Sequence, residues 1–173
     1  MNPLKSISGT IIGGFVLAAI ILYFMPGEHV VGVPLKSLVI WLHVLSGVTW
    51  IGLLYYFNFV QVPALGEAAG DEGGPGGAGI AKYVAPRALW WFRWGALATW
   101  LTGAIFLHLQ GMLHHAFTLG LMGDSPNPYA TTIGIGAWLG TIMLFNVWGL
   151  IWPNQKKILG MVEATAEEVA KAK

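Results

Sequence analysis

The chain has 173 residues and no cysteine, and this absence excludes several kinds of redox site. Disulfide bonds, iron–sulfur clusters with thiolate ligands and a c-type haem attached through Cys-x-x-Cys-His all require cysteine. Charged residues are scarce as well, at 10%, whereas an ordinary soluble domain has about a quarter. The net charge of +1 comes without a basic patch interleaved with aromatic residues, so a nucleic-acid partner is not expected.

Apolar residues make up 55% of the chain and gather in four long runs. An α-helix needs about 20 apolar residues to cross the ~30 Å hydrocarbon core of a bilayer, and each run is about that long. Prolines stand near the ends of the runs, where helices usually begin or stop. The sequence therefore predicts an all-α fold, an integral membrane four-helix bundle in a single domain of residues 1–161. The expected helices span about residues 8–25, 38–62, 89–112 and 131–152, and the prolines at their edges are Pro26, Pro34, Pro63, Pro86, Pro128 and Pro153.

Positive charges near the helix ends indicate which way the chain is inserted. If the four helices alternate in direction, Lys36 lies alone on one side, and the remaining cations near helix ends lie on the other. Cytoplasmic loops carry an excess of lysine and arginine, so both termini are expected in the cytoplasm. The cations on the expected cytoplasmic side are Lys5, Lys82, Arg87, Arg93, Lys156 and Lys157.

Two segments outside the expected helices are polar. Residues 66–79 are rich in glycine, alanine and acidic residues, a composition typical of a flexible linker, and we expect a mobile cytoplasmic loop there. Residues 162–173 consist mainly of alanine, glutamate and lysine, which are good helix formers. We expect them to form a polar helical tail.

His43 stands inside the second apolar run, where an imidazole is costly unless it is bound to something. It lies within two helical turns of the expected outer end of its helix. His108 lies about one turn from the outer end of the third helix, at a comparable depth. Gly47 and Trp50 share a helical stripe with His43, and Ala104 lies one turn below His108. Small residues beside these histidines would leave room for the edge of a porphyrin.

This pattern supports a haem b held by His43, with His108 as the second axial ligand, or otherwise His114 or His115. One alternative is a zinc or copper site built from His108, His114 and His115. Another is that His43 only hydrogen-bonds across the bundle, while the histidines near the outer connection are solvated.

A second polar set lies in the inner half of the expected bundle. It could form a pocket for a small polar or anionic ligand, with an arginine as the charge partner. It could equally provide hydrogen bonds between helices, with the arginine extending to the headgroups. The set consists of Asn58, Gln61, Arg93 and Asn146.

Three motifs carry a resemblance to a known family. They read WLHVLSGVTWIGLLYYFNFVQVP from Trp41, WFRWGA from Trp91 and NVWGLIWPNQKK from Asn146. Together they closely resemble the membrane domain of bacterial membrane-bound urate hydroxylases, also described as the urate oxidase N-terminal domain family. The resemblance extends from about Leu38 to Lys157 and so covers most of the chain.

The resemblance implies a bacterial inner-membrane protein with a redox role. Family members join the membrane domain to a cytochrome c domain that takes electrons from urate oxidation. This chain has no Cys-x-x-Cys-His and is similar to a stand-alone form of the membrane domain. The histidine followed by Trp-x-Gly in the second run is also similar, more faintly, to four-helix bacterial membrane protoporphyrinogen oxidases, which are thought to bind haem b.

These observations give three expectations for function. The first is a haem b-binding electron-transfer unit that works with a membrane or periplasmic redox partner or as a homo-oligomer. The second is a membrane oxidase of urate or a related small heterocycle, which binds its substrate in the inner polar pocket and passes electrons to an external cytochrome c. The third is a cofactor-free structural subunit of a larger membrane complex.

Overall fold

A computed structural model describes residues 2, 5–24, 34–122 and 126–172. Within these residues the chain is helical, with no β-strand, and the all-α prediction is confirmed. The chain divides into two compact units at Leu38 and Val39. Each unit is described by itself. Pro26, His29 and Asp124 lie outside the described residues.

The first unit contains helix α1 (Ile7–Phe24), close to the expected residues 8–25. The hydroxyl of Ser6 begins the helix, because it accepts a hydrogen bond of 3.0 Å from the backbone N–H of Gly9. Apolar side chains surround α1 on all sides, and almost all of the described ones are exposed within the chain. A helix that is apolar all round is stable in lipid or against other protein, not in water.

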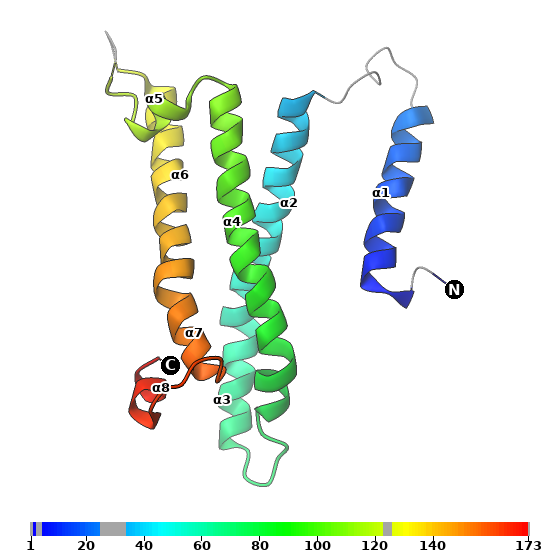
Figure 1. Cartoon of the computed structure of the whole chain (residues 1–173), viewed down its shortest axis with the longest axis vertical. Helices are drawn as coiled ribbons and strands as arrows, with labels where there is room; N and C mark the ends of the chain where they lie inside the picture. Colours follow the sequence, from blue (N-terminus) through cyan, green and yellow to red (C-terminus); the bar gives the residue numbers. More distant parts are fainter. Residues whose placement is uncertain (1, 3–4, 25–33, 123–125, 173) are drawn as a thin grey trace. The chain divides into compact units, whose positions relative to one another are not determined.

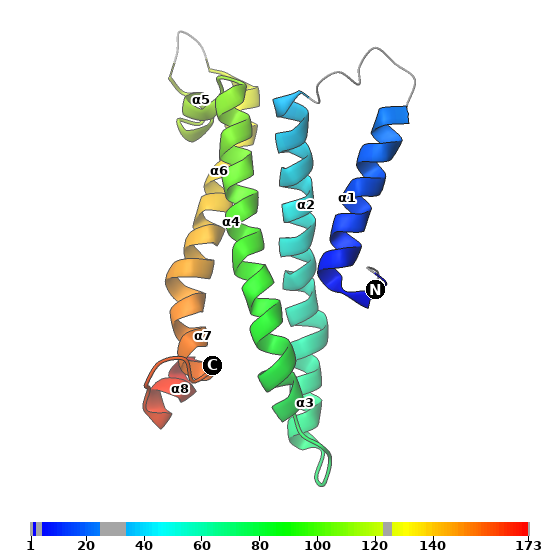
Figure 2. The same ribbon diagram turned by 45° about the vertical axis from the view of Figure 1, so that its right-hand side comes forward.

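The second unit, which begins at Val39 within α2, is built on three long helical rods. Both views show the α4 rod between the α2–α3 rod and the α6–α7 rod (Figures 1 and 2). A hydrogen bond between His43 and Thr99 joins α2 to α4, and one between Trp100 and Thr141 joins α4 to α6. The elements of the rods are α2 (Leu35–Tyr56), η3 (Phe57–Gln61) and α3 (Val62–Gly70); η4 (Ile80–Val84) and α4 (Ala85–Leu109); and α6 (Pro128–Phe145), η5 (Asn146–Ile151) and α7 (Trp152–Ile158).

Pro63 and Pro153 do not end helices, although the expected helices stopped just before them, whereas Pro86 stands near a helix start, as expected. Each stands at the beginning of an α-helix that continues directly from a π-helical turn: η3, η4 or η5. Proline clashes with the carbonyl four residues before it and cannot donate to it, and in each case that carbonyl falls inside the π-helical turn. The wider π-helical turn accommodates the proline without breaking the rod. Pro34 and Pro128 stand at helix starts as well.

Continuity through the prolines lengthens two of the rods. Leu35–Gly70 and Pro128–Ile158 are long and apolar enough to cross a membrane. The first rod also takes up residues 66–70 of the expected loop 66–79, so the described connection to the next rod is shorter than the sequence indicated.

The core of the second unit lies where the three rods pack at mid-length. Its buried side chains are Trp50 from α2, Phe92 and Ala96 from α4, and Val147 from η5. Gly95 is buried against the backbone of Trp50, so its lack of a side chain lets α2 and α4 approach closely. Half-buried apolar residues complete this core: Ile51, Leu53, Leu54, Phe57, Leu144 and Trp148.

The connection between α4 and α6 contains the short helix α5 (Leu113–Phe117), which packs on the beginning of α6. The hydroxyl of Thr131 donates a 2.7 Å hydrogen bond to the carbonyl of Leu119, and the indole of Trp138 donates one of 3.1 Å to the carbonyl of Phe117. These bonds hold Phe117 beside α6.

The tail contains helix α8 (Ala166–Ala172) in the segment expected to be helical. Thr165 and Glu168 form a capping box: the backbone N–H of Thr165 donates to the Glu168 carboxylate at 2.9 Å, and the N–H of Glu168 donates to the Thr165 hydroxyl at 3.2 Å. The Lys157 ammonium lies 3.4 Å from the same carboxylate, so an ion pair ties α8 to α7.

Candidate functional site: a histidine-lined cavity and a buried arginine

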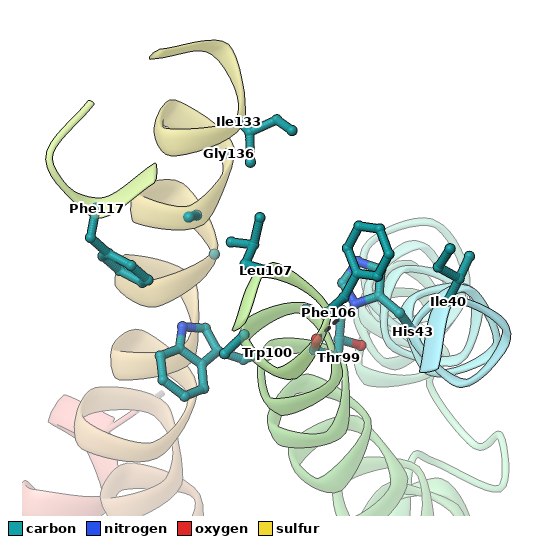
Figure 3. A pocket seen from close by; sticks show the side chains of 13 residues that line it. Ile40, His43, Thr99, Trp100, Phe106, Leu107, Phe117, Ile133 and Gly136 are labelled. Carbon is teal, nitrogen blue, oxygen red and sulfur yellow. Dashed lines mark hydrogen bonds between the residues drawn. The ribbon is translucent and has the colours of Figure 1, made fainter. Parts of the chain in front are cut away.

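An apolar cavity of about 500 Å³ lies among α2, α4, α5 and α6. This volume is in the range of small-molecule sites. In Figure 3, His43 and Ile40 come from α2 on one side, Phe117 and Ile133 come from α5 and α6 on the other, and α4 lies between them. Apart from His43 and Thr99, the lining is apolar or aromatic: Ile40, Trp100, Gly103, Ala104, Phe106, Leu107, Phe117, Ile133, Gly136, Ala137 and Gly140.

Among the described residues, His43 is the only one that contributes an imidazole to the cavity lining. Its Nδ1 lies 2.9 Å from the backbone carbonyl oxygen of Thr99 and 3.3 Å from the hydroxyl of Thr102 (Figure 3). A carbonyl can only accept, so Nδ1 carries the proton and donates it to Thr99. In the neutral ring Nε2 then has a free lone pair. Within the described residues Nε2 has no hydrogen bond and is not among the fully enclosed polar atoms.

This geometry fits a metal-ligating histidine. Such histidines usually donate the N–H of the non-ligating nitrogen to a carboxylate or backbone carbonyl, which fixes the tautomer and the ring orientation. Here the carbonyl of Thr99 has that role and Nε2 of His43 is the available ligand atom. The residues present therefore fit a porphyrin iron on His43, in an apolar cavity walled partly by small residues.

Gly103 allows the imidazole to lie against α4. A Cβ atom at this position would be 3.0 Å from Cε1 and 3.3 Å from Nδ1 of His43, which is closer than ordinary packing allows. The sequence reasoning missed Thr99, Thr102 and Gly103. Thr102 and Gly103 follow Thr99 by three and four residues, so all three lie on one face of α4. This spacing is the signal that could have identified them.

The other residues expected around a haem fall in different places. Ala104 lines the cavity, as expected. Gly47 and Trp50 do not line it and lie instead in the interface between α2 and α4, where a Cβ on Gly47 would contact the Thr99 methyl at 3.8 Å and Trp50 is in the core. These two residues bring the helices together below the cavity.

His108 does not come together with His43, although the two were expected to be axial ligands of one haem. Thr99 faces His43, and His108 is nine positions further along α4, which at about 100° per residue places it half a turn away, on the opposite side of the helix. The side chain of His108 is exposed. Similar depth along antiparallel helices does not put two side chains on facing surfaces.

His114 and His115 are exposed on α5, with ring centroids 6.2 Å apart. Among the described residues there is no group of three or more histidine, aspartate or glutamate side chains placed to hold a metal ion. The alternative zinc or copper site of His108, His114 and His115 is therefore not assembled in this part of the chain.

Arg93 is the central residue of the inner polar set. Only 7% of it is exposed, and its guanidinium carbon lies 3.4 Å from the ring centroid of Trp152. Its Nε is buried without a hydrogen-bond partner, and within the described residues no carboxylate pairs with it. The side chain of Arg93 is thus largely enclosed by protein, with its guanidinium against the ring of Trp152.

Within the described residues, no hydrogen bond joins Arg93 to the three other members of the inner set. Gln61 is buried, with 8% exposed, and its Oε1 lacks a partner. Asn58 is exposed, and its amide donates to the carbonyl of Leu54 at 2.8 Å, back along its own helix. Asn146 is half-buried at the start of η5. None of the four lines the cavity beside His43.

No family model, curated protein or solved structure matches the chain.

Proposed function

We propose that this chain is a multi-pass protein of the bacterial inner membrane that binds haem b on His43 and transfers electrons. We also propose that it belongs to the urate hydroxylase membrane-domain family that its motifs resemble. The observation that carries the proposal is the 2.9 Å hydrogen bond from Nδ1 of His43 to Thr99, which leaves Nε2 free beside an apolar cavity.

Membrane insertion in this proposal involves four spans: α1, α2–α3, α4 and α6–α7. Two of these rods have the length and apolar composition to cross a bilayer, and α1 is apolar all round. Large apolar side chains are exposed along all four, as lipid contact requires. The excess of lysine and arginine at one end of the rods supports cytoplasmic termini.

The cavity supports a haem more than a soluble polar ligand, because its walls are mainly apolar and aromatic. When bound, haem b supplies one-electron redox chemistry through its iron. The chain supplies His43 as a ligand, Thr99 to fix the tautomer, and Gly103 to admit the ring. His108 is on the far side of α4, so the proposal assigns a single histidine of this chain to the iron.

The urate-oxidising alternative has less support from the geometry. It places the substrate among Asn58, Gln61, Arg93 and Asn146, and within the described residues no hydrogen bond joins any of these four side chains to another. The electron-transfer role is therefore the one that the site supports best.

Haem content of purified variants tests the proposal. Replacing His43 by alanine should remove haem, measured as pyridine haemochromogen per mole of protein, while replacing the exposed His115 by alanine should leave it unchanged. Equal haem content in the two variants would contradict the assignment. Size-exclusion chromatography in detergent shows whether each variant is folded.

A further inference from the structure

Arg93 carries a charge for which the described chain offers no counter-ion. Arginine remains protonated in proteins, and a buried guanidinium is normally paired with an acid. The ion pairs in the described residues are Lys157–Glu168 and Lys171–Glu167, and both lie in the C-terminal segment. Arg93 is 7% exposed and its Nε is a donor without a partner, so it can donate a hydrogen bond to an acceptor that comes from outside the chain.

The contacts between α4 and the α6–α7 rod show where Arg93 points. Trp100 bonds to Thr141, and the ring of Trp94 contacts that of Trp148 at 5.4 Å, so Arg93 starts near the level of Trp148. Its guanidinium stacks on Trp152, four residues or about 6 Å further along the rod. The side chain therefore runs toward the end of the rods where α7 lies, which is the proposed cytoplasmic end.

A second cation shares the same indole. The ammonium of Lys156 lies 5.8 Å from the ring centroid of Trp152. Lys156 is half-buried, and within the described residues no carboxylate pairs with it. One indole ring thus contacts both a guanidinium and an ammonium, and the repulsion between these two positive charges is reduced if an anion lies near both of them.

We propose that Arg93 and Lys156 bind an oxyanion at the cytoplasmic end of α4 and α7. The guanidinium offers a planar set of donors that suits phosphate or carboxylate oxygens, and the lysine adds a point charge. In a bilayer the available oxyanion is the phosphate of an anionic phospholipid, which basic pockets between transmembrane helices bind on the cytoplasmic side. A free anion such as inorganic phosphate offers the same chemistry.

This site is distinct from the haem cavity. Arg93 is six residues, or about 9 Å, from Thr99 along α4, and it does not line the cavity. The inference rests on the proposed membrane insertion and not on haem binding. The haem content of the variants below distinguishes the two: it should be unchanged by substitutions at Arg93 or Lys156.

The experiment measures the thermal unfolding midpoint of the full chain in detergent with added phosphatidylglycerol or phosphatidylcholine. A second arm compares inorganic phosphate with chloride at matched ionic strength. A ligand that binds only the folded state raises the midpoint, and we expect phosphatidylglycerol to raise it by about 5 °C relative to phosphatidylcholine. Arg93→Gln should abolish this rise. Arg87→Gln is the matched control, because Arg87 is exposed and already donates to the carbonyl of Tyr83, and it should retain the rise.

An Arg93-dependent rise with phosphatidylglycerol identifies a lipid phosphate, and one with inorganic phosphate alone identifies a soluble anion; both support the oxyanion site. The site is overturned if neither ligand raises the wild-type midpoint, or if Arg93→Gln responds as the wild type does. If Arg93→Gln does not fold, Lys156→Gln replaces it. A reduced rise in Lys156→Gln supports the site, and an unchanged rise overturns it.

Discussion

Nδ1 of His43 lies 2.9 Å from the carbonyl oxygen of Thr99, and this contact joins α2 to α4 at the edge of the apolar cavity. The acceptor is a backbone atom, so its position depends on the helix itself and not on a rotatable side chain. The imidazole is therefore held in one tautomer with Nε2 available. The proposed haem ligation by His43 depends on this hydrogen bond.

Alanine substitutions at His43 and His108, the two expected axial ligands, should have very different effects on haem content. His43→Ala should lower haem content to background, because it removes the assigned iron ligand. His108→Ala should retain haem, because His108 is exposed on the opposite side of α4. Visible absorbance per mole of detergent-purified protein checks both variants. Loss of haem in His108→Ala would show that the iron has a second ligand at that position.

Gly103→Ala should displace the imidazole. The new Cβ would be 3.0 Å from Cε1 of His43, and relieving this overlap should cost about 1–3 kcal/mol of stability and weaken haem binding. Gly52→Ala is the matched control, because a Cβ there meets no atom within 4 Å. Alanine has the higher helix propensity, so this control should be neutral or slightly stabilising. Chemical denaturation and haem titration measure the two effects, and equal behaviour of the two variants would contradict the packing described for Gly103.

Trp100→Phe should loosen α4 from α6. The substitution removes a 2.8 Å hydrogen bond from the indole to the Thr141 hydroxyl while keeping an aromatic wall in the cavity. We expect a loss of about 1 kcal/mol in the free energy of unfolding, with haem retained. Trp138→Phe provides a comparison in the same unfolding measurement. Trp138 is exposed, and the substitution removes the hydrogen bond from its indole to the carbonyl of Phe117.

The docking of α8 should depend on pH. The hydrogen bond from the backbone of Thr165, together with the nearby Lys157 ammonium, lowers the pKa of Glu168 below its ordinary value of 4.5. The folded state then binds this proton less readily than the unfolded state does, so the stabilisation is present above about pH 4.5 and is lost as the pH falls through the lowered pKa. A fluorescent label on α8 should report undocking in this acid range. Glu168→Gln should show no such transition, because it removes the carboxylate that titrates.

Thr165→Ala should weaken α8 without changing the ion pair to Lys157. It removes the hydroxyl that accepts a hydrogen bond from the N–H of Glu168 and so caps the helix. Loss of such a cap typically costs about 1 kcal/mol of helix stability. Circular dichroism and amide exchange of the tail measure the loss. Unchanged protection of the α8 amides would contradict the capping box.

The sequence was sufficient to predict an all-helical chain and to single out His43 and Arg93, because both conclusions depend on local pattern. Long apolar runs form helices in almost any context, and a titratable side chain inside such a run is conspicuous. The structure agrees that both residues are in unusual surroundings: His43 lines a cavity and Arg93 is buried without a counter-ion.

The sequence could not show which residues face one another. Whether His43 and His108 face each other depends on which side of α4 is turned toward α2. The close packing of Gly95 and Gly103 against α2 sets that orientation. The continuation of helices through Pro63 and Pro153 was also missed. Proline alone predicts a break, whereas here a π-helical turn before each of these prolines keeps the rod continuous.

The measurement that tests the central claim most directly is the dithionite-reduced minus oxidised visible spectrum of the detergent-purified chain, with pyridine haemochromogen for stoichiometry. The account predicts a b-type α-band and about one haem per chain. A featureless spectrum from protein that is folded by circular dichroism, and that remains featureless after incubation with haem, would contradict it.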